Sequence, residues 1–249
     1  MSAAIGARTV GWLGADLGDG VVAGTTTRAG GVSKGPFESL NLALHVGDAP
    51  EAVAANRARL AAALALPGEP LWLHQVHGAD VVVHDGTRRQ PTADGAVAFE
   101  RHRVLAVLTA DCLPVALAAD DGSCVGLAHA GWRGLLAGVL ERTVAALGTP
   151  GGRLRAWLGP AIGPAAFEVG DEVRAAFVAA EARDAAAFTP NARGRWQADL
   201  YALARARLAR LGVVRVAGGA ECTFTDAGRF YSYRRDPRAG RMATLVWRR

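Results

Sequence analysis

Three side chains in the sequence have the chemistry of metal ligands. Cys112 lies in "TADCLPV", His129 follows seventeen residues later in "AHAGWRG", and His77 lies in "HQVHG". Each of them falls where a predicted strand meets a loop. One thiolate and two imidazoles with an open fourth position are typical of a catalytic zinc site, which keeps one place for water or substrate. The residues therefore predict a metal site, although their spacing is not the C-x-x-C of structural zinc modules.

The same residues allow other interpretations. Cys112 could be a nucleophile, with His129 or His77 as its base and Asp111 as the group that orients the base. Each ligand could also be structural, because a lone cysteine in an apolar run is usually a small buried hydrophobe. Cys222 in "ECTF" could complete a closed structural site as a fourth ligand. The sequence leaves these alternatives open.

Length and composition limit the class of protein. The chain has 249 residues and is 51% hydrophobic, which predicts one catalytic domain over residues 1–249. No apolar run reaches the roughly 18 to 20 residues of a membrane span. The net charge of +5 comes from scattered arginines with no basic run interleaved with aromatics, so it is weak evidence for nucleic acid, and a small anionic ligand or a composition rich in alanine and arginine explains it equally well. Three widely spaced cysteines and no secretory signal predict a cytoplasmic protein, and we expect a monomer.

Apolar periodicity and turn residues predict the elements that position these side chains. A strand from residue 20 onward leads into a loop rich in glycine and threonine. Helices are expected over 48–66, with Asp48 as N-cap, and over 132–148, ending at Gly148. Further helices are expected over 169–180 and 198–212, and strands over 71–85 (two), 103–111, 113–120, 124–130, 155–163, 213–220, 229–235 and 242–247. This mixture predicts an α+β (mixed α/β) fold, in which mixed β-sheets are flanked by helices in layers.

Nine short motifs resemble, in this order, the signature of one family. They are "TRAGGVS", "SLNLALHVGD", "NRARL", "QVHGADV", "TADCLPV", "HAGWRG", "AIGPAAFEVG", "CTF" and "FYSYRRD…GRMA", and they extend over about residues 23–247. The family has been described as laccase-like polyphenol oxidases, as purine nucleoside phosphorylases with adenosine deaminase activity, and as peptidoglycan editing factors. The resemblance implies a metal held by His77, Cys112 and His129, the three residues identified above. His74, His84 and His102 match no metal-binding position.

The resemblance also implies an activity and further site residues. It implies a purine nucleoside and phosphate as substrates, zinc as the metal, and copper as a possible replacement because copper outcompetes zinc at most nitrogen and sulfur sites. Asp111 is a candidate for proton transfer or for orienting a ligand imidazole. Arg133 and Arg28 are candidates for holding phosphate, with an ion pair as the structural alternative for Arg133. Asn41 and His45 are candidates for contacting substrate, although Asn41 could also close a turn.

We therefore expect a zinc-dependent purine nucleoside enzyme. Its expected activities are phosphorolysis of adenosine, inosine or S-methyl-5'-thioadenosine and hydrolytic deamination of adenosine. A zinc ion in such a site lowers the pKa of its bound water to about 7. A copper-binding, laccase-like polyphenol oxidase is the weaker alternative, since the six histidines of the chain form no H-x-H pair of the kind that a multicopper site needs. A cysteine hydrolase or an editing factor acting on peptidoglycan precursors is the third.

Overall fold

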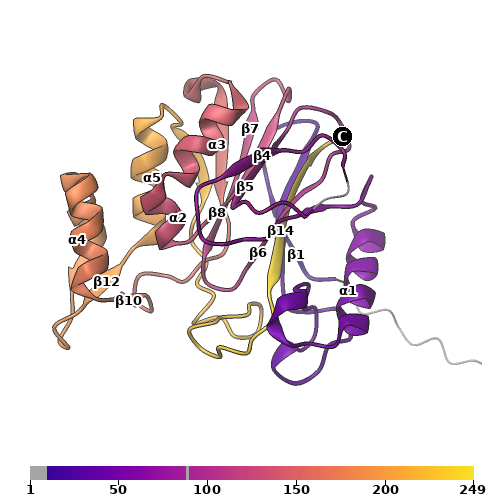
Figure 1. The fold of residues 1–249 in the computed structure, drawn as a ribbon, viewed down its shortest axis with the longest axis horizontal. Helices are drawn as coiled ribbons and strands as arrows, with labels where there is room; N and C mark the ends of the chain where they lie inside the picture. The colour runs from indigo at the N-terminus through magenta and orange to yellow at the C-terminus, as the bar shows by residue number, and fades with distance from the viewer. Residues whose placement is uncertain (1–9, 88–89) are drawn as a thin grey trace, which may run out of the picture.

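Alternating side chains on the central strands divide the molecule into layers. In β7 (Leu113–Ala119), Leu113 and Val115 pack against helices, whereas Ala116 and Ala118 pack against a second sheet. A strand that is apolar on both faces is typical of a sheet covered on both sides. The computed structural model describes residues 10–87 and 90–249. Helices, a first sheet, a second sheet and a further helix follow one another across it (Figure 1).

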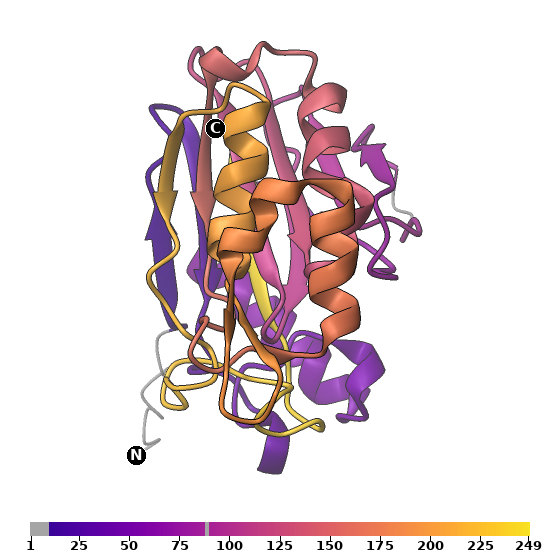
Figure 2. The ribbon, with the colours of Figure 1, turned by 90° about the vertical axis from the view of Figure 1, so that its left-hand side faces the viewer.

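The first sheet is mixed and carries the helical layer. Its six strands are, in spatial order, β13 (Arg215–Gly218), β9 (Leu154–Leu158), β7, β8 (Val125–Ala130), β5 (Gly95–Ala98) and β4 (Val81–Val83). The helices on its outer face include α3 (Val139–Leu147) and α5 (Leu200–Arg210), whose buried residues share one core cluster with β7 and β9. Figure 2 shows α5 and its neighbouring helices in front of this sheet.

The second sheet packs on the inner face of the first. Its strands are, in order, β1 (Trp12–Ala15), β2 (Val21–Thr26), β14 (Met242–Arg248), β6 (Leu105–Thr109) and β3 (Leu71–Trp72). Val107 and Val246 meet Leu127 of the first sheet between the layers. On the outer face, α1 (Pro50–Ala63) buries Leu60 against the sheet near Trp72. One hydrophobic core therefore lies between the two sheets. A second lies between the first sheet and its helices, and a third lies between the second sheet and α1.

Short elements extend the helical side. They are α2 (Trp132–Ala137), α4 (Asp171–Ala180), a three-stranded sheet of β10 (Glu168–Val169), β12 (Trp196–Ala198) and β11 (Phe188–Pro190), and the 3-10 helices η1 (Gly35–Phe37), η2 (Leu44–Val46), η3 (Gly151–Arg153) and η4 (Ala182–Ala187). None of the helices in the described part of the chain is long and apolar enough to cross a membrane.

The predicted α+β fold with layered mixed sheets is confirmed, and three local predictions are wrong. The helix expected over 132–148 is broken at Gly138, whose φ of 88° lies in the left-handed region that glycine adopts without strain. Asp48 is not the N-cap of α1, because Ala49 holds that position and the Asp48 carboxylate accepts hydrogen bonds from Ser33 and Asn41 instead. Residues 229–235 form turns rather than a strand, because Ser232 and Arg235 bond to Asp111 and to the carbonyls of residues 223–224 in neighbouring loops.

Candidate metal centre

The three predicted ligands come together where strands of the first sheet end. His129 lies in β8 and pairs with Pro114 of β7, so that Cys112, at the entrance to β7, lies beside it. His77 comes from the loop between β3 and β4, with a left-handed φ of 60°. Their ligand atoms all lie within 4.8 Å of one another, and the two imidazole rings meet edge to face at 70°. His129 is buried, Cys112 half-buried and His77 exposed, so the cluster opens to one side.

A buried carboxylate that sequence reasoning missed holds both histidines. Asp94 Oδ1 lies 2.7 Å from His129 Nδ1 and accepts a hydrogen bond from the His77 backbone N–H at 3.0 Å. Its Oδ2 accepts from the N–H groups of Val76 at 3.1 Å and Gly78 at 2.7 Å. When Nδ1–H of His129 donates to Asp94, Nε2 is left as the metal-binding nitrogen. One side chain thus sets the tautomer of one ligand and the loop conformation of the other.

The charges at the centre favour an ionised thiol. Burial raises the pKa of the Cys112 thiol, but the two neighbouring imidazoles outweigh burial and lower it below its usual range. Burial lowers the pKa of His129, but Cys112 and Asp94 outweigh burial and raise it. The thiolate is the form of cysteine that binds metal. A metal ion would replace the proton that Cys112 and His129 otherwise attract, so metal binding here releases protons.

Gly131 leaves the space that the Cys112 sulfur occupies. A Cβ at position 131 would lie 2.8 Å from Cys112 Sγ and 3.5 Å from His77 Cδ2. The backbone of Gly131, with φ −63° and ψ 167°, suits any residue. Its glycine is therefore required by the sulfur and not by the chain conformation.

This close approach predicts the effect of Gly131→Ala. We expect the variant to fold normally but to bind metal about 10–100-fold more weakly. Displacing the Cys112 sulfur should reduce the metal affinity as much as losing a hydrogen bond that supports a ligand. Competition with a chromogenic chelator measures the affinity. Gly152→Ala is the matched control, since an added Cβ there meets nothing within 4 Å. Equal metal affinity in the two variants would contradict this role of Gly131.

The cluster lies in a cavity of about 620 Å³ that carries both aromatic and cationic side chains. Trp132, Phe167 and Tyr233 contribute aromatic surface, and Arg133, Arg234 and Arg241 contribute positive charge, together with His45, Gln75 and Asp111. Arg133 stacks 4.4 Å from the centre of the Trp132 ring, and Arg234 lies 5.6 Å from that of Phe167. A flat aromatic ligand with an anionic partner fits such a lining.

Two of the predicted substrate residues lie outside this cavity, whereas Asp111, Arg133 and His45 line it. Arg28 lines a separate cavity, with its guanidinium donating to the carbonyls of Glu38 and Ala227. Asn41 is fully buried and closes a turn by bonding to both the N–H and the C=O of Ala43. The turn-closing alternative for Asn41 therefore matches its contacts.

Asp111 has different partners from those expected of it. Its carboxylate accepts hydrogen bonds from the hydroxyls of Thr223 at 2.6 Å and Ser232 at 3.0 Å and from the Arg234 N–H at 2.7 Å. Asp94, and not Asp111, orients the ligand imidazole. Asp111 instead joins two loops that enclose the cavity. Within the described residues, Arg133 forms no ion pair shorter than 4.0 Å. The alternative that Arg133 forms a structural ion pair therefore has no support there.

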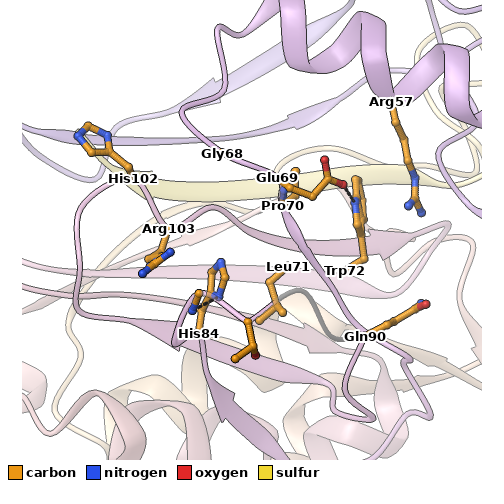
Figure 3. A pocket seen from close by; sticks show the side chains of 12 residues that line it. Arg57, Gly68, Glu69, Pro70, Leu71, Trp72, His84, Gln90, His102 and Arg103 are labelled. Atoms are coloured by element: carbon orange, nitrogen blue, oxygen red, sulfur yellow. Dashed lines mark hydrogen bonds between the residues drawn. The ribbon is translucent and has the colours of Figure 1, made fainter.

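The remaining cysteine and histidine candidates lie away from the cluster. Cys222 Sγ accepts a hydrogen bond from the Gly163 N–H and lines another cavity, so it is not the fourth ligand. His74 is exposed at an isolated bridge, as expected of a strand residue. His84 and His102 line a separate hollow of about 420 Å³, together with residues of α1 and β3 (Figure 3).

The donor set fits one metal ion. Among residues 10–87 and 90–249, His77, Cys112 and His129 are the one group of three or more side chains close enough to share an ion. A thiolate with two imidazoles suits zinc and also binds copper. Several copper ions do not fit, because two of the six histidines of the chain lie in this group and the other four do not. The arrangement therefore supports a single-ion centre with an open coordination position.

Comparison with known proteins agrees with the motif resemblance. The family model described as "Multi-copper polyphenol oxidoreductase laccase" matches residues 22–249. A purine nucleoside phosphorylase of Pseudomonas aeruginosa is 56% identical over 223 residues, covering 89% of this chain and 91% of the relative. A purine nucleoside phosphorylase of Escherichia coli is 51% identical over 229 residues, covering 92% and 94%. A solved protein of Neisseria meningitidis is 46% identical with a TM-score of 0.92, covering 95% of this chain and 98% of that one.

The family match spans all three residues of the metal cluster. The predicted family is confirmed; the family model carries the description of an oxidase, whereas the two relatives carry the name of a nucleoside enzyme. The chain therefore belongs to the multi-copper polyphenol oxidoreductase laccase family, and its relatives from Pseudomonas aeruginosa and Escherichia coli carry the name purine nucleoside phosphorylase.

Proposed function

We propose that this protein is a zinc-dependent purine nucleoside phosphorylase that also deaminates adenosine. The observation that carries the proposal is a three-ligand cluster with an open side, set in a 620 Å³ cavity that combines aromatic and arginine side chains. The names of the relatives support the phosphorylase activity. Adenosine, inosine and S-methyl-5'-thioadenosine are the proposed nucleosides. All share a purine ring, which the aromatic lining accommodates.

The arginines of the cavity account for the second substrate. Phosphate needs donors that match its oxygens, and the planar guanidinium supplies two N–H groups at once. Arg133 reaches the cavity from the start of α2, and Arg234 and Arg241 reach it from the segment 231–241. Arg234 and Arg241 are anchored, since their side chains donate to the carbonyls of Glu168 and Ala239. Arg133 is exposed and free to close on the anion.

The protein side chains divide the remaining work. A zinc ion bound here supplies a Lewis acid that lowers the pKa of a bound water to about 7. Asp94 keeps His129 in the ligating tautomer, and Cys112 adds the negative charge that retains the ion. Asp111, held by Thr223 and Ser232 at the wall of the cavity, is the proposed proton donor or acceptor for the purine. His45, at the cavity edge, is the proposed contact for the nucleoside.

The freedom of Arg133 predicts a phosphate-specific defect. Arg133→Ala is expected to raise the KM for phosphate by about 10-fold or more, the effect of one charge-assisted hydrogen bond, and to leave the metal content unchanged. Steady-state phosphorolysis of inosine at varied phosphate measures it. The control is Arg142→Ala, an exposed arginine of α3 that pairs with Asp80 outside the cavity. An unchanged KM for phosphate would remove Arg133 from the phosphate site.

The direct test of the function is a product assay on protein purified without added metal. Zinc and copper are quantified, and adenosine is offered with and without phosphate while adenine, inosine, hypoxanthine and ribose 1-phosphate are followed. Phosphate-dependent release of adenine with one zinc per chain is the expected result. Phosphate-independent formation of inosine would report the deaminase. Zinc-loaded protein that turns over no nucleoside would overturn the proposal.

One observation favours a second candidate function, a cysteine hydrolase acting on a substrate such as a peptidoglycan precursor. Cys112, His129 and Asp94 are connected in that order, as in a thiol, base and orienting carboxylate. This enzyme would work without metal and would lose activity when zinc occupies the thiolate. Activity that rises on chelation would favour it. Oxidase activity remains the weaker alternative, and it requires phenol oxidation that depends on copper loading.

We further propose that the enzyme acts as a cytoplasmic monomer. Its three cysteines are unpaired in the structure, as expected of a protein kept under reducing conditions. Light scattering after size exclusion should give a mass near the 25.8 kDa of one chain. A stable larger species would contradict the monomer.

A further inference from the structure

A second cavity, of about 400 Å³, lies apart from the metal centre and is rich in arginine. It lies between the loop after β2 and the segment before β14, which are joined where the Arg28 N–H donates to the Arg229 carbonyl. Figure 1 shows this yellow segment beside the indigo and purple loops below the sheets. The residues that line the cavity are Arg28, Gly35, Pro36, Tyr231, Arg235, Asp236, Arg238 and Ala239. None of them lines the metal cavity.

Two of these arginines are held rigidly without losing their charge. Arg28 donates to the carbonyls of Glu38 at 2.9 Å and Ala227 at 3.0 Å and stacks on the Tyr231 ring at 4.9 Å. Arg235 donates to three further backbone carbonyls, at 2.6 to 2.8 Å. Within the described residues, neither guanidinium has a carboxylate oxygen within 4.0 Å. Carbonyl groups fix an arginine in place but do not neutralise it.

The only acidic side chain among the lining residues compensates little of this charge. Asp236 lies 3.5 Å from Arg238 Nε, and 79% of the Arg238 side chain is exposed. An exposed ion pair of this length contributes little, and a ligand can displace it. Three arginines and one aspartate line the cavity, which leaves a net charge of +2. Such a surplus in a concave site attracts an anion of matching charge.

We propose that this cavity binds the phosphate group of a small sugar phosphate, at a site separate from the metal centre. Phosphate monoesters carry between one and two negative charges at neutral pH, which matches the surplus of +2. Fixed guanidinium groups recognise phosphate oxygens in pairs. A volume of about 400 Å³ exceeds the need of a bare phosphate and leaves room for a sugar beside the Tyr231 ring.

The site also adjoins the proposed reaction. The segment 231–241 contributes Tyr231, Arg235 and Arg238 to this cavity and Tyr233, Arg234 and Arg241 to the metal cavity. The Ser232 hydroxyl between them bonds to Asp111, and it also accepts from the Arg235 N–H. A ligand held by Arg235 and Arg238 therefore contacts the segment that forms one wall of the metal cavity. The binding proposal itself does not depend on the proposed reaction.

Calorimetric titration of the full-length, metal-loaded protein tests the site. The probes are ribose 5-phosphate, inorganic phosphate and uncharged ribose. Arg238→Ala is the informative variant, because Arg28 and Arg235 also hold loop carbonyls. We expect ribose 5-phosphate to bind, ribose not to bind, and Arg238→Ala to weaken ribose 5-phosphate on the order of 10-fold. Arg238→Glu should abolish binding, and Arg142→Ala should leave it unchanged.

A variant of the metal cavity separates the two sites. Arg133→Ala is expected to leave the affinity for ribose 5-phosphate at this site unaltered. Inorganic phosphate that binds as tightly as ribose 5-phosphate, with the same loss in Arg238→Ala, would support a phosphate site that makes no use of the sugar. The proposal is overturned if neither anion binds at millimolar concentration, or if Arg133→Ala removes the binding and Arg238→Glu retains it.

Discussion

Replacing Cys112 by serine is expected to remove both the metal and the nucleoside activity. A serine hydroxyl stays protonated at neutral pH, so the site loses its one negatively charged ligand and keeps two neutral imidazoles. We expect the zinc affinity to fall by more than about 100-fold, beyond the loss from a supporting contact, and phosphorolysis to fall to background. The measurements are zinc content after dialysis and release of hypoxanthine from inosine in the presence of phosphate.

The other two cysteines of the chain are matched controls for this result. Cys124 is buried near Leu147 and Thr149, and Cys222 bonds to the Gly163 N–H, so neither sulfur faces the cluster. Cys124→Ser and Cys222→Ser should both keep the zinc. If Cys222→Ser loses zinc as fully as Cys112→Ser, the site is closed and structural, and the catalytic interpretation fails. If Cys112→Ser loses activity but apo wild-type protein keeps it, Cys112 is a nucleophile.

The metal ligands could be predicted because both the ends of strands and the side chains that bind metal can be recognised from short stretches of the sequence. Cys112 and His129 each adjoin a short apolar run, and such runs become neighbouring strands whose ends meet. His77 was predicted in the same way, from its place between two predicted strands, and the motif resemblance implied the same three residues. The layered fold could be predicted for the same reason, since period-2 alternation indicates a strand even when its partner strand is unknown.

The support around the ligands could not be predicted, because it depends on backbone groups. Asp94 is important through three backbone N–H groups, of residues 76–78, and one imidazole. Neither its own neighbours "TADG" nor its distance from His77 reports that contact. A polar residue immediately before a buried strand was the available signal, and many surface turns share it. Asp111 was predicted to orient a ligand imidazole only because it is adjacent to Cys112 in the chain.

Motif membership likewise does not reveal which cavity a residue lines. Arg28 and Asn41 belong to family motifs, but Arg28 faces the second cavity and Asn41 closes a buried turn. Arg234 and Arg241 also belong to a family motif, and they line the metal cavity although neither was predicted as a site residue. Arg234 lies in residues 229–235, which form turns instead of the predicted strand. Turn geometry decides on which side each side chain emerges, and alternation does not apply there.

Replacing Asp94 by asparagine should show that a single buried carboxylate organises the centre. The substitution keeps the shape, but the amide nitrogen cannot accept the hydrogen bonds that one carboxylate oxygen now receives. Either the pair from Val76 and Gly78 or the pair from His77 and His129 is lost. We expect zinc affinity to fall about 10–100-fold, the range for supporting partners of ligand histidines, with a matching loss of phosphorolysis at limiting zinc.

The informative control is Asp111→Asn, since both aspartates are buried beside the cluster and differ in what they touch. Asp111 bonds to Thr223, Ser232 and the Arg234 N–H, none of which is a metal ligand. Its variant should keep its zinc and, if Asp111 transfers protons, lose turnover even at saturating zinc. For Asp94→Asn, excess zinc should restore turnover, because the defect lies in occupancy of the site. Failure of excess zinc to restore it would mean that Asp94 acts on the reaction directly, as the orienting carboxylate of a Cys112 and His129 pair.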